Sequence, residues 1–184
     1  MPQFAHLPLL LKPDGNGKLS KRDGDRLGFP VFPLEWKDPV SGEVSSGYRE
    51  KGYFPEAFVN ILAFLGWNPG TSQELFSMEE LAEAFSLERV GKAGSKYDPN
   101  KARWFNQQYL RGKHDATLAQ LLKQNYGDVK DVADSDEAFL AGVCGMMKER
   151  ATFLADIPKE GAYFFEAPTE YDPKTTRKRW KEGS

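Results

Sequence analysis

Apolar residues recur at helical spacing in residues 53–67, "YFPEAFVNILAFLGW". The repeat follows i, i+3, i+4, i+7, which places its members on one face of a helix. These members are Phe58, Ile61, Leu62 and Leu65. Pro55 stands at a favourable first helical position, and Gly66 stands where a glycine stop belongs. The pattern predicts a helix from Pro55 to about Leu65 with those four side chains buried.

The same periodicity predicts four more helices downstream. Ser77 and Glu80 have capping-box spacing, and Asp98 followed by Pro99 is a helix start. The predicted helices cover residues 77–86, 97–112, 114–127 and 135–157, the last being the longest. Their expected inward side chains are Met78, Leu81, Ala82, Phe85, Leu118, Leu121, Leu122, Phe139, Val143, Met147 and Leu154.

The N-terminal part has a different pattern. Residues 6–11, "HLPLLL", predict a short buried strand that leads into a polar, basic, glycine-rich loop at 15–25. Residues 28–47 contain three prolines, which restrict strands to sheet edges, and predict an exposed hairpin that turns at Asp38 to Gly42. The fold class is therefore mainly α, with a short strand and hairpin segment at the N-terminus. A mild boundary near "KAGSKYDP" divides the chain into 1–95 and 96–184.

The composition of the chain excludes several kinds of binding and catalytic site. The net charge of −2 means that any nucleic-acid or phosphate contact must come from a local patch. One cysteine, Cys144, excludes a disulfide framework and fits a reducing cytosol. With only His6 and His114 beside it, a Cys/His zinc site or a Ser-His-Asp triad is not expected, and we predict no metal site in the chain. No apolar run reaches about 18 residues, so no membrane span is expected.

The segment "DGNGKLS" matches neither the phosphate-loop motif nor the calcium-loop motif. A phosphate loop needs a glycine where Lys12 stands and a serine or threonine where Leu19 stands. A calcium loop needs a ligand where Lys18 stands and a glycine at Leu19. The loop is therefore not a self-contained phosphate or calcium site.

"KLSKR", residues 18–22, resembles the Lys-Met-Ser-Lys-Ser-type loop of class I aminoacyl-tRNA synthetases. The flanks sharpen the resemblance. "FAHLPLLLKPDGNGKLSKRDGD" is similar to the glutamyl-tRNA synthetase form of this loop, and "GYFPEAFVNILAFLGW" to the helix after it. "FSLERVGKAGSKYDPNKARWFNQQYL" resembles the next block, which ends in a Lys-x-x-Trp-x-Asn helix. The resemblance is clear from about residue 4 to 111, weakens through 155 and returns at "AYFFE".

The resemblance implies an enzyme that activates glutamate with ATP and Mg²⁺ and transfers it to tRNA(Glu). Lys21 is then the main ATP contact, Lys18 assists it, and Ser20 and Arg22 shape the loop. Ammonium groups that close on the departing pyrophosphate stabilise its charge in the transition state. Gly15, Gly17 and Gly24 are expected to let the loop open and close. Without the flanks, a solvated basic turn would be the simpler interpretation of the loop; the flanks favour the synthetase loop.

The chain departs from the family pattern. The family's His-x-Gly-His motif and the βαβ unit that carries it are absent, so we expect a middle fragment that is inactive alone. A stand-alone helical module that binds tRNA or protein is the alternative. The 28–47 excursion is longer than the family pattern, and is either a surface decoration or a contact to tRNA or to the mouth of the site. The resemblance further implies a cytoplasmic, monomeric protein.

The resemblance also implies tRNA contacts in the third predicted helix. The candidates are Lys101, Arg103, Asn106 and Arg111, which need one exposed face to meet phosphates. Of the adjacent Trp104 and Phe105, we expect Trp104 to be the core residue. Further basic side chains either lie on a solvated face or contact RNA. Those at the C-terminus are more simply explained as part of the first turns of a next helical domain. They are Lys92, Lys96, Lys174, Arg177, Lys178, Arg179 and Lys181. His114 is expected at a helix entry, and Cys144, Met146 and Met147 in the core.

Overall fold

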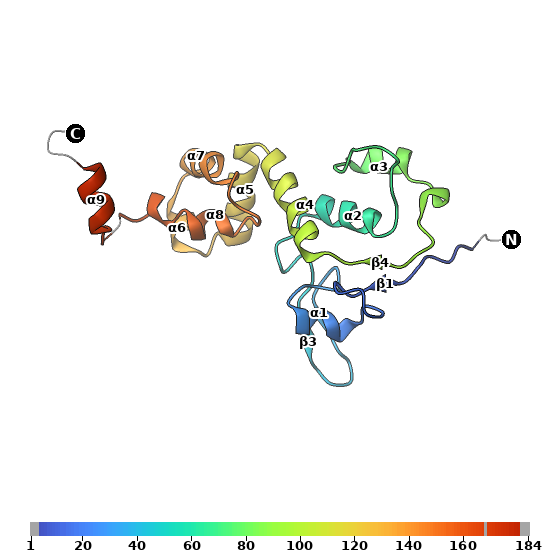
Figure 1. Cartoon of the computed structure of the whole chain (residues 1–184). Helices are drawn as coiled ribbons and strands as arrows, with labels where there is room; N and C mark the ends of the chain where they lie inside the picture. The colour runs from blue at the N-terminus through green and yellow to red at the C-terminus, as the bar shows by residue number, and fades with distance from the viewer. Residues whose placement is uncertain (1–3, 168, 181–184) are drawn as a thin grey trace.

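The protein is described by a computed structural model that covers residues 4–167 and 169–180. Figure 1 shows an elongated, mainly helical molecule with two short strand pairs near the N-terminus. The N-terminal elements are β1 (Leu10–Leu11), α1 (Lys21–Leu27), β2 (Trp36–Lys37), β3 (Val44–Ser45), α2 (Pro55–Phe64), α3 (Met78–Ala84), η1 (Leu87–Arg89) and β4 (Ser95–Lys96). The C-terminal elements are α4 (Pro99–Gly112), α5 (Asp115–Tyr126), α6 (Lys130–Asp134), α7 (Glu137–Met147), α8 (Asp156–Glu160), η2 (Ala162–Phe164) and α9 (Pro173–Arg179). The mainly α prediction is confirmed.

The predicted helix starts are confirmed. They are predictable because the residues that signal them act on neighbouring backbone groups. Pro55 and Pro99 open α2 and α4. The Asp98 carboxylate accepts hydrogen bonds from two backbone N–H groups in the first turn of α4. Ser77 and Glu80 form the predicted capping box, in which each side chain accepts a hydrogen bond from the other residue's N–H group. His114 is the N-cap residue of α5, as expected for a helix entry.

Three apolar clusters hold these helices together. The first contains Phe29, Tyr48, Tyr53, Ile61, Tyr97, Ala102 and Phe105. The second contains Phe54, Ala57, Leu110, Leu118, Ala119, Leu122, Val132, Leu140, Val143, Cys144, Met147, Ala151, Leu154 and Ile157. The third contains Trp67, Phe76 and Leu81. Figure 1 shows α4 running from the N-terminal elements toward α5–α8, and its residues belong to both the first and the second cluster.

Several predicted inward faces are wrong in part. In α2, Leu62 is exposed, while Ala57, Asn60 and Ile61 are buried. On the face predicted for residues 77–86, which form α3, only Leu81 is buried. Five residues predicted to face inward are exposed: Leu62, Met78, Ala82, Phe85 and Phe139. Met146, which was expected in the core, is exposed as well. Leu121 is half-buried at the rim of the second cluster.

The single long helix predicted for 135–157 is also wrong. The helix α7 ends at Met147, and a turn leads to the separate α8. Asp156 Oδ2 accepts hydrogen bonds from the N–H groups of Thr152 (3.0 Å) and Phe153 (2.8 Å), which stabilises the break. Val143, Met147 and Leu154 are nevertheless buried, because the turn brings Leu154 back to the same core.

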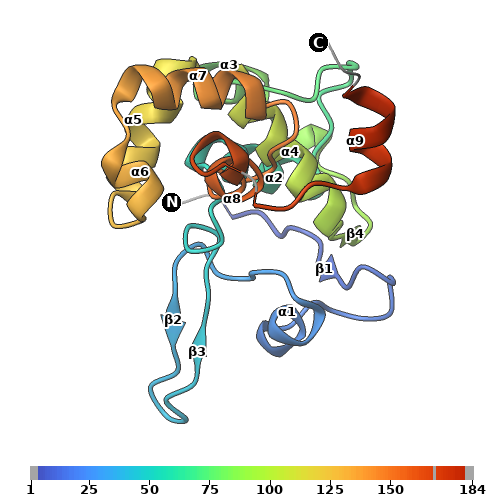
Figure 2. The same cartoon turned by 90° about the vertical axis from the view of Figure 1, so that its left-hand side faces the viewer.

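The strand prediction for 6–11 is only partly confirmed. Leu10 and Leu11 pair in parallel with Ser95 and Lys96, but Leu7, Leu9 and Leu10 are exposed rather than buried. The hairpin prediction is confirmed: β2 and β3 are antiparallel, and the Asp38 carboxylate accepts hydrogen bonds from the N–H groups of Val40 and Ser41 in the turn. Figure 2 shows this hairpin extending away from the helices.

The proposed division at residues 95 and 96 stays a prediction, although Tyr97, Ala102 and Phe105 pack against residues of the N-terminal part. Within the described ranges, no helix has both the length and the apolar content needed to cross a membrane.

Candidate functional site

The glycine-rich loop is a tight turn that is tied back on itself. Leu19 N–H donates to Leu10 O (2.8 Å), and Gly15 N–H donates to Lys12 O (2.8 Å). Gly15 and Gly17 have φ values of 79° and 88°, in the left-handed region that favours glycine. A Cβ atom at Gly15 would lie 2.9 Å from Lys96 Nζ, so the Lys96 ammonium from β4 lies against the loop.

The second half of the predicted loop is a helix. Ser20 is the N-cap of α1, and its backbone N–H (2.9 Å) and its hydroxyl (2.6 Å) both donate to Asp23 Oδ2. Arg26 donates to Asp23 Oδ1 at 3.0 Å, and Lys12 Nζ lies 3.5 Å from the same oxygen. The hydrogen bonds from Ser20, followed by those from Arg26 and the charge of Lys12, hold the Asp23 pKa well below its usual range. Ser20 therefore fixes the start of α1 through Asp23, a partner that sequence reasoning missed.

Gly24 does not act as a hinge. It lies inside α1, where an added Cβ would meet the Val31 side chain and would lie 2.8 Å from Phe29 O. The absence of a side chain lets α1 pack closely against the chain that leads into the hairpin. Gly24 therefore lies in a helix and not in the loop where it was expected, whereas Gly15 and Gly17 do lie in the turn.

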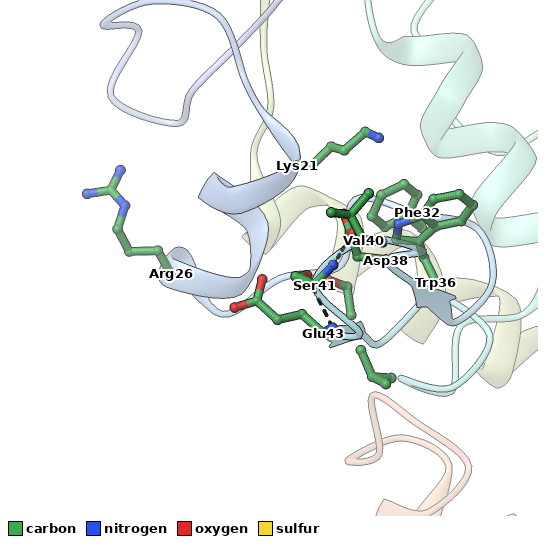
Figure 3. Close-up of a pocket in the computed structure, with 10 residues that line it drawn as sticks. Lys21, Arg26, Phe32, Trp36, Asp38, Val40, Ser41 and Glu43 are labelled. Carbon is green, nitrogen blue, oxygen red and sulfur yellow. Dashed lines mark hydrogen bonds between the residues drawn. The ribbon is translucent and has the colours of Figure 1, made fainter.

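Lys21 is the first residue of α1 and faces an open pocket between α1 and the hairpin. The pocket has a volume of about 1110 Å³. Its walls are Lys21, Arg26, Phe32, Trp36, Asp38, Val40, Ser41, Glu43, Val44 and Ser45. Figure 3 shows the Lys21 side chain extending beside Phe32, with Arg26 pointing away on the other side of α1. The Lys21 ammonium lies 5.4 Å from the Trp36 ring centroid and 5.7 Å from that of Phe32.

Lys18 and Arg22 are the remaining predicted ATP-binding residues of the loop. Lys18 is exposed, and its backbone pairs with Leu11 across the turn. The Arg22 side chain lies outside the described residues. The structure thus brings together Lys18, Ser20 and Lys21 on one short segment, with the two lysines accessible to an anion.

The predicted tRNA-facing residues do not share one exposed face. Asn106 is fully buried: its Oδ1 accepts from Phe54 N–H (2.8 Å), and its Nδ2 donates to Thr152 O (2.7 Å). Its expected exposure is wrong because these buried backbone groups need a side-chain partner. Since helix positions are about 100° apart, Lys101 and Arg103 project roughly 200° apart.

The remaining cations of α4 differ in their contacts. Lys101 Nζ lies 2.7 Å from Glu74 Oε1 and 3.7 Å from the Trp104 ring centroid. Arg111 forms an ion pair with Glu149. Arg103 is exposed. Lys101 and Arg111 are therefore each paired with a glutamate, while Arg103 is exposed at the surface.

Trp104 is not the core residue of its pair. Phe105 is 2% exposed, whereas Trp104 is half-buried and packs at the edge of the first cluster under Lys101. Cys144 and Met147 are buried as expected, and burial raises the pKa of the Cys144 thiol to about 12.

At the C-terminus, Lys174, Arg177, Lys178 and Arg179 belong to α9, which Asp172 caps. Lys181 lies outside the described residues.

Comparison with known protein families identifies the family to which this chain belongs. Residues 1–104 match the sequence model described as tRNA synthetases class I (E and Q), catalytic domain. The chain belongs to this family. Residues 116–184 of this synthetase chain match a second model, the anticodon binding domain, which includes the part up to residue 155 where the resemblance was expected to be weaker.

Individual relatives agree with this assignment. A glutamate–tRNA ligase of Christiangramia forsetii is 55% identical over 183 residues, and one of Cytophaga hutchinsonii is 59% identical over 180 residues. These alignments cover 100% and 98% of this synthetase chain but 36% and 34% of the relatives. A crystal structure of a glutamate tRNA ligase from Elizabethkingia meningosepticum, in complex with its amino acid, superposes with a TM-score of 0.88 at 46% identity. It covers 99% of this chain and 36% of that one. The chain thus spans about a third of the length of its curated relatives.

Proposed function

We propose that this chain is the part of a glutamate–tRNA ligase that supplies the ATP-phosphate loop and tRNA contacts. The complete enzyme activates glutamate with ATP and Mg²⁺ and transfers the glutamyl group to the 3′ end of tRNA(Glu). The observation that carries the proposal is the placement of Lys21. Its backbone is fixed by the Ser20–Asp23 cap, while its ammonium is exposed at the mouth of an open pocket.

The chemistry follows from charge. When glutamate attacks the α-phosphate of ATP, negative charge grows on the departing pyrophosphate. An ammonium that contacts this pyrophosphate lowers the energy of the transition state more than that of bound ATP. Lys21 is the catalytic residue in this proposal, and Lys18 assists from the preceding turn. Ser20 acts by fixing the start of α1, and Arg22 is proposed to bind ATP with them.

The tRNA contacts are proposed for Arg103, with Lys101 and Arg111 as weaker candidates because Glu74 and Glu149 already pair with them. A basic α9 adds phosphate contacts further along the chain. We propose that the complete protein is cytoplasmic and monomeric, and that this chain alone forms no glutamyl-adenylate.

The test is the Lys21→Ala variant of the full-length enzyme, assayed by ATP–pyrophosphate exchange. We expect exchange to slow by about 10²–10³-fold, the range found when one preorganised charge-stabilising donor is removed. Circular dichroism and the unfolding midpoint should stay unchanged, because the Lys21 side chain is exposed. Wild-type exchange in a folded Lys21→Ala enzyme would contradict the proposed role.

A further inference from the structure

Two aromatic side chains of the hairpin lie beside the Lys21 ammonium. Phe32 and Trp36 are stacked, with ring centroids 5.5 Å apart and planes 21° apart. The Lys21 ammonium lies within 6 Å of both ring centroids, the range in which a ring face attracts a cation. Figure 3 shows the lysine and both rings on the same side of the pocket.

The hairpin that carries these rings is held firmly at both ends. At its base, Tyr48 N–H donates to Phe32 O (2.9 Å), and Tyr48 itself is buried in the first cluster. At its tip, Asp38 N–H donates to Glu43 O (2.8 Å). Trp36 is paired with Ser45 between these points. The rings therefore form a fixed surface rather than part of a loose loop.

The backbone of Lys21 is fixed as well. The Ser20–Asp23 hydrogen bonds set the start of α1, and the close approach of Gly24 to Val31 packs the helix against the base of the hairpin. What remains free is the flexible lysine stem, whose ordering opposes phosphate binding. A surface that pre-orders this stem reduces that cost.

A carboxylate of the hairpin adds to the attraction. Hydrogen bonds from the N–H groups of Ser41 and Val40 hold the Asp38 pKa below its ordinary value, and the charge of Lys21 contributes to the same shift. The hairpin thus presents both ring faces and a negative charge toward Lys21.

We propose that Phe32 and Trp36 are positioning residues that hold the Lys21 side chain extended at the pocket mouth before ATP binds. This assigns a task to the 28–47 excursion, and it rests on the proposed function of Lys21. Neither aromatic residue contacts ATP in this proposal; each acts through the lysine.

The experiment uses the full-length enzyme with Trp36→Ala, Trp36→Phe and the control Leu34→Ala. Leu34 is an exposed apolar residue of the same hairpin that does not line the pocket. From the strength of a cation–π contact at an exposed site, Trp36→Ala should lower kcat/KM for ATP in pyrophosphate exchange by roughly two- to five-fold. Trp36→Phe should retain most of the activity, and Leu34→Ala should equal wild type.

The decisive measurement is a double-mutant cycle with Lys21→Ala. If Trp36 acts through Lys21, Trp36→Ala has no further effect in the Lys21→Ala background. An equal loss in both backgrounds, an equal loss in Leu34→Ala, or faster exchange in Trp36→Ala would overturn the inference. If Lys21→Ala itself exchanges at the wild-type rate, the proposed function fails. If Lys21→Ala is slow and Trp36→Ala is unchanged, only the positioning role fails.

Discussion

Replacing Asn106 by alanine should destabilise the chain strongly, although the residue looks like a surface amide in the sequence. Its side chain is fully buried and serves two backbone groups from distant segments, Phe54 N–H and Thr152 O. Alanine leaves both groups without their partner. At about 1–3 kcal/mol for each of the two unsatisfied groups, the free energy of unfolding should fall by roughly 2–6 kcal/mol. That is a large share of the ~5–15 kcal/mol typical of a domain.

Urea unfolding followed by tryptophan fluorescence measures this loss. With an m-value of about 2 kcal/mol/M, the urea midpoint should fall by roughly 1–3 M. The matched control is Gln107→Ala, which removes an amide from the next position of α4, where the side chain is half-exposed. That control should change stability by less than about 0.5 kcal/mol. Equal midpoints for Asn106→Ala and wild type would refute the assignment of Asn106 as a buried bridge.

Three further outcomes are expected. Because the Asp23 pKa is lowered by folding, its contribution is present above the unfolded-state pKa of about 3.9 and is lost as pH falls through the lower folded-state value. The protection of amides at the start of α1 against hydrogen exchange, relative to their intrinsic rate at each pH, should therefore fall in acid in wild type but not in Asp23→Asn. Gly24→Ala should lower the free energy of unfolding by about 1–3 kcal/mol, because the added methyl group overlaps Val31. Gly142→Ala, on the open face of α7, should instead raise the free energy of unfolding by about 0.5–1 kcal/mol, and urea unfolding measures both changes. Cys144 should react with a thiol reagent at pH 8 only as fast as the second cluster opens, because the thiol is buried and its pKa is raised to about 12; rapid labelling of the folded chain would contradict this.

Local signals in the sequence predicted the helix starts well. Pro55, Asp98 and the Ser77–Glu80 pair act on neighbouring backbone groups, so no knowledge of the tertiary structure is needed. The hairpin turn at Asp38 was predictable for the same reason. The Ser20–Asp23 cap has a similar spacing and could have been found, but the glycines around it favoured a loop.

What the sequence could not decide was which side of an element meets the core. Trp104 and Phe105 are both large and aromatic, and only the position of Tyr97 and Ile61 makes Phe105 the buried one. Asn106 is a polar residue whose burial depends on backbone groups 52 and 46 residues away in the sequence. The relation of Lys21 to Trp36 likewise requires the hairpin to fold back beside α1, which periodicity does not encode.

The helix α4 has a consequence for how halves of such enzymes can be exchanged. Ala102 and Phe105 belong to the first cluster, while Leu110, on the same continuous helix, belongs to the second. A chimera cut near residue 95 separates Ala102 and Phe105 from the partners with which they pack. A chimera joined at the connection between α4 and α5 keeps those two residues with their own partners, and of the three only Leu110 must fit a foreign core. Inheritance of the two halves from different ancestors is therefore better tolerated at that connection than near residue 95.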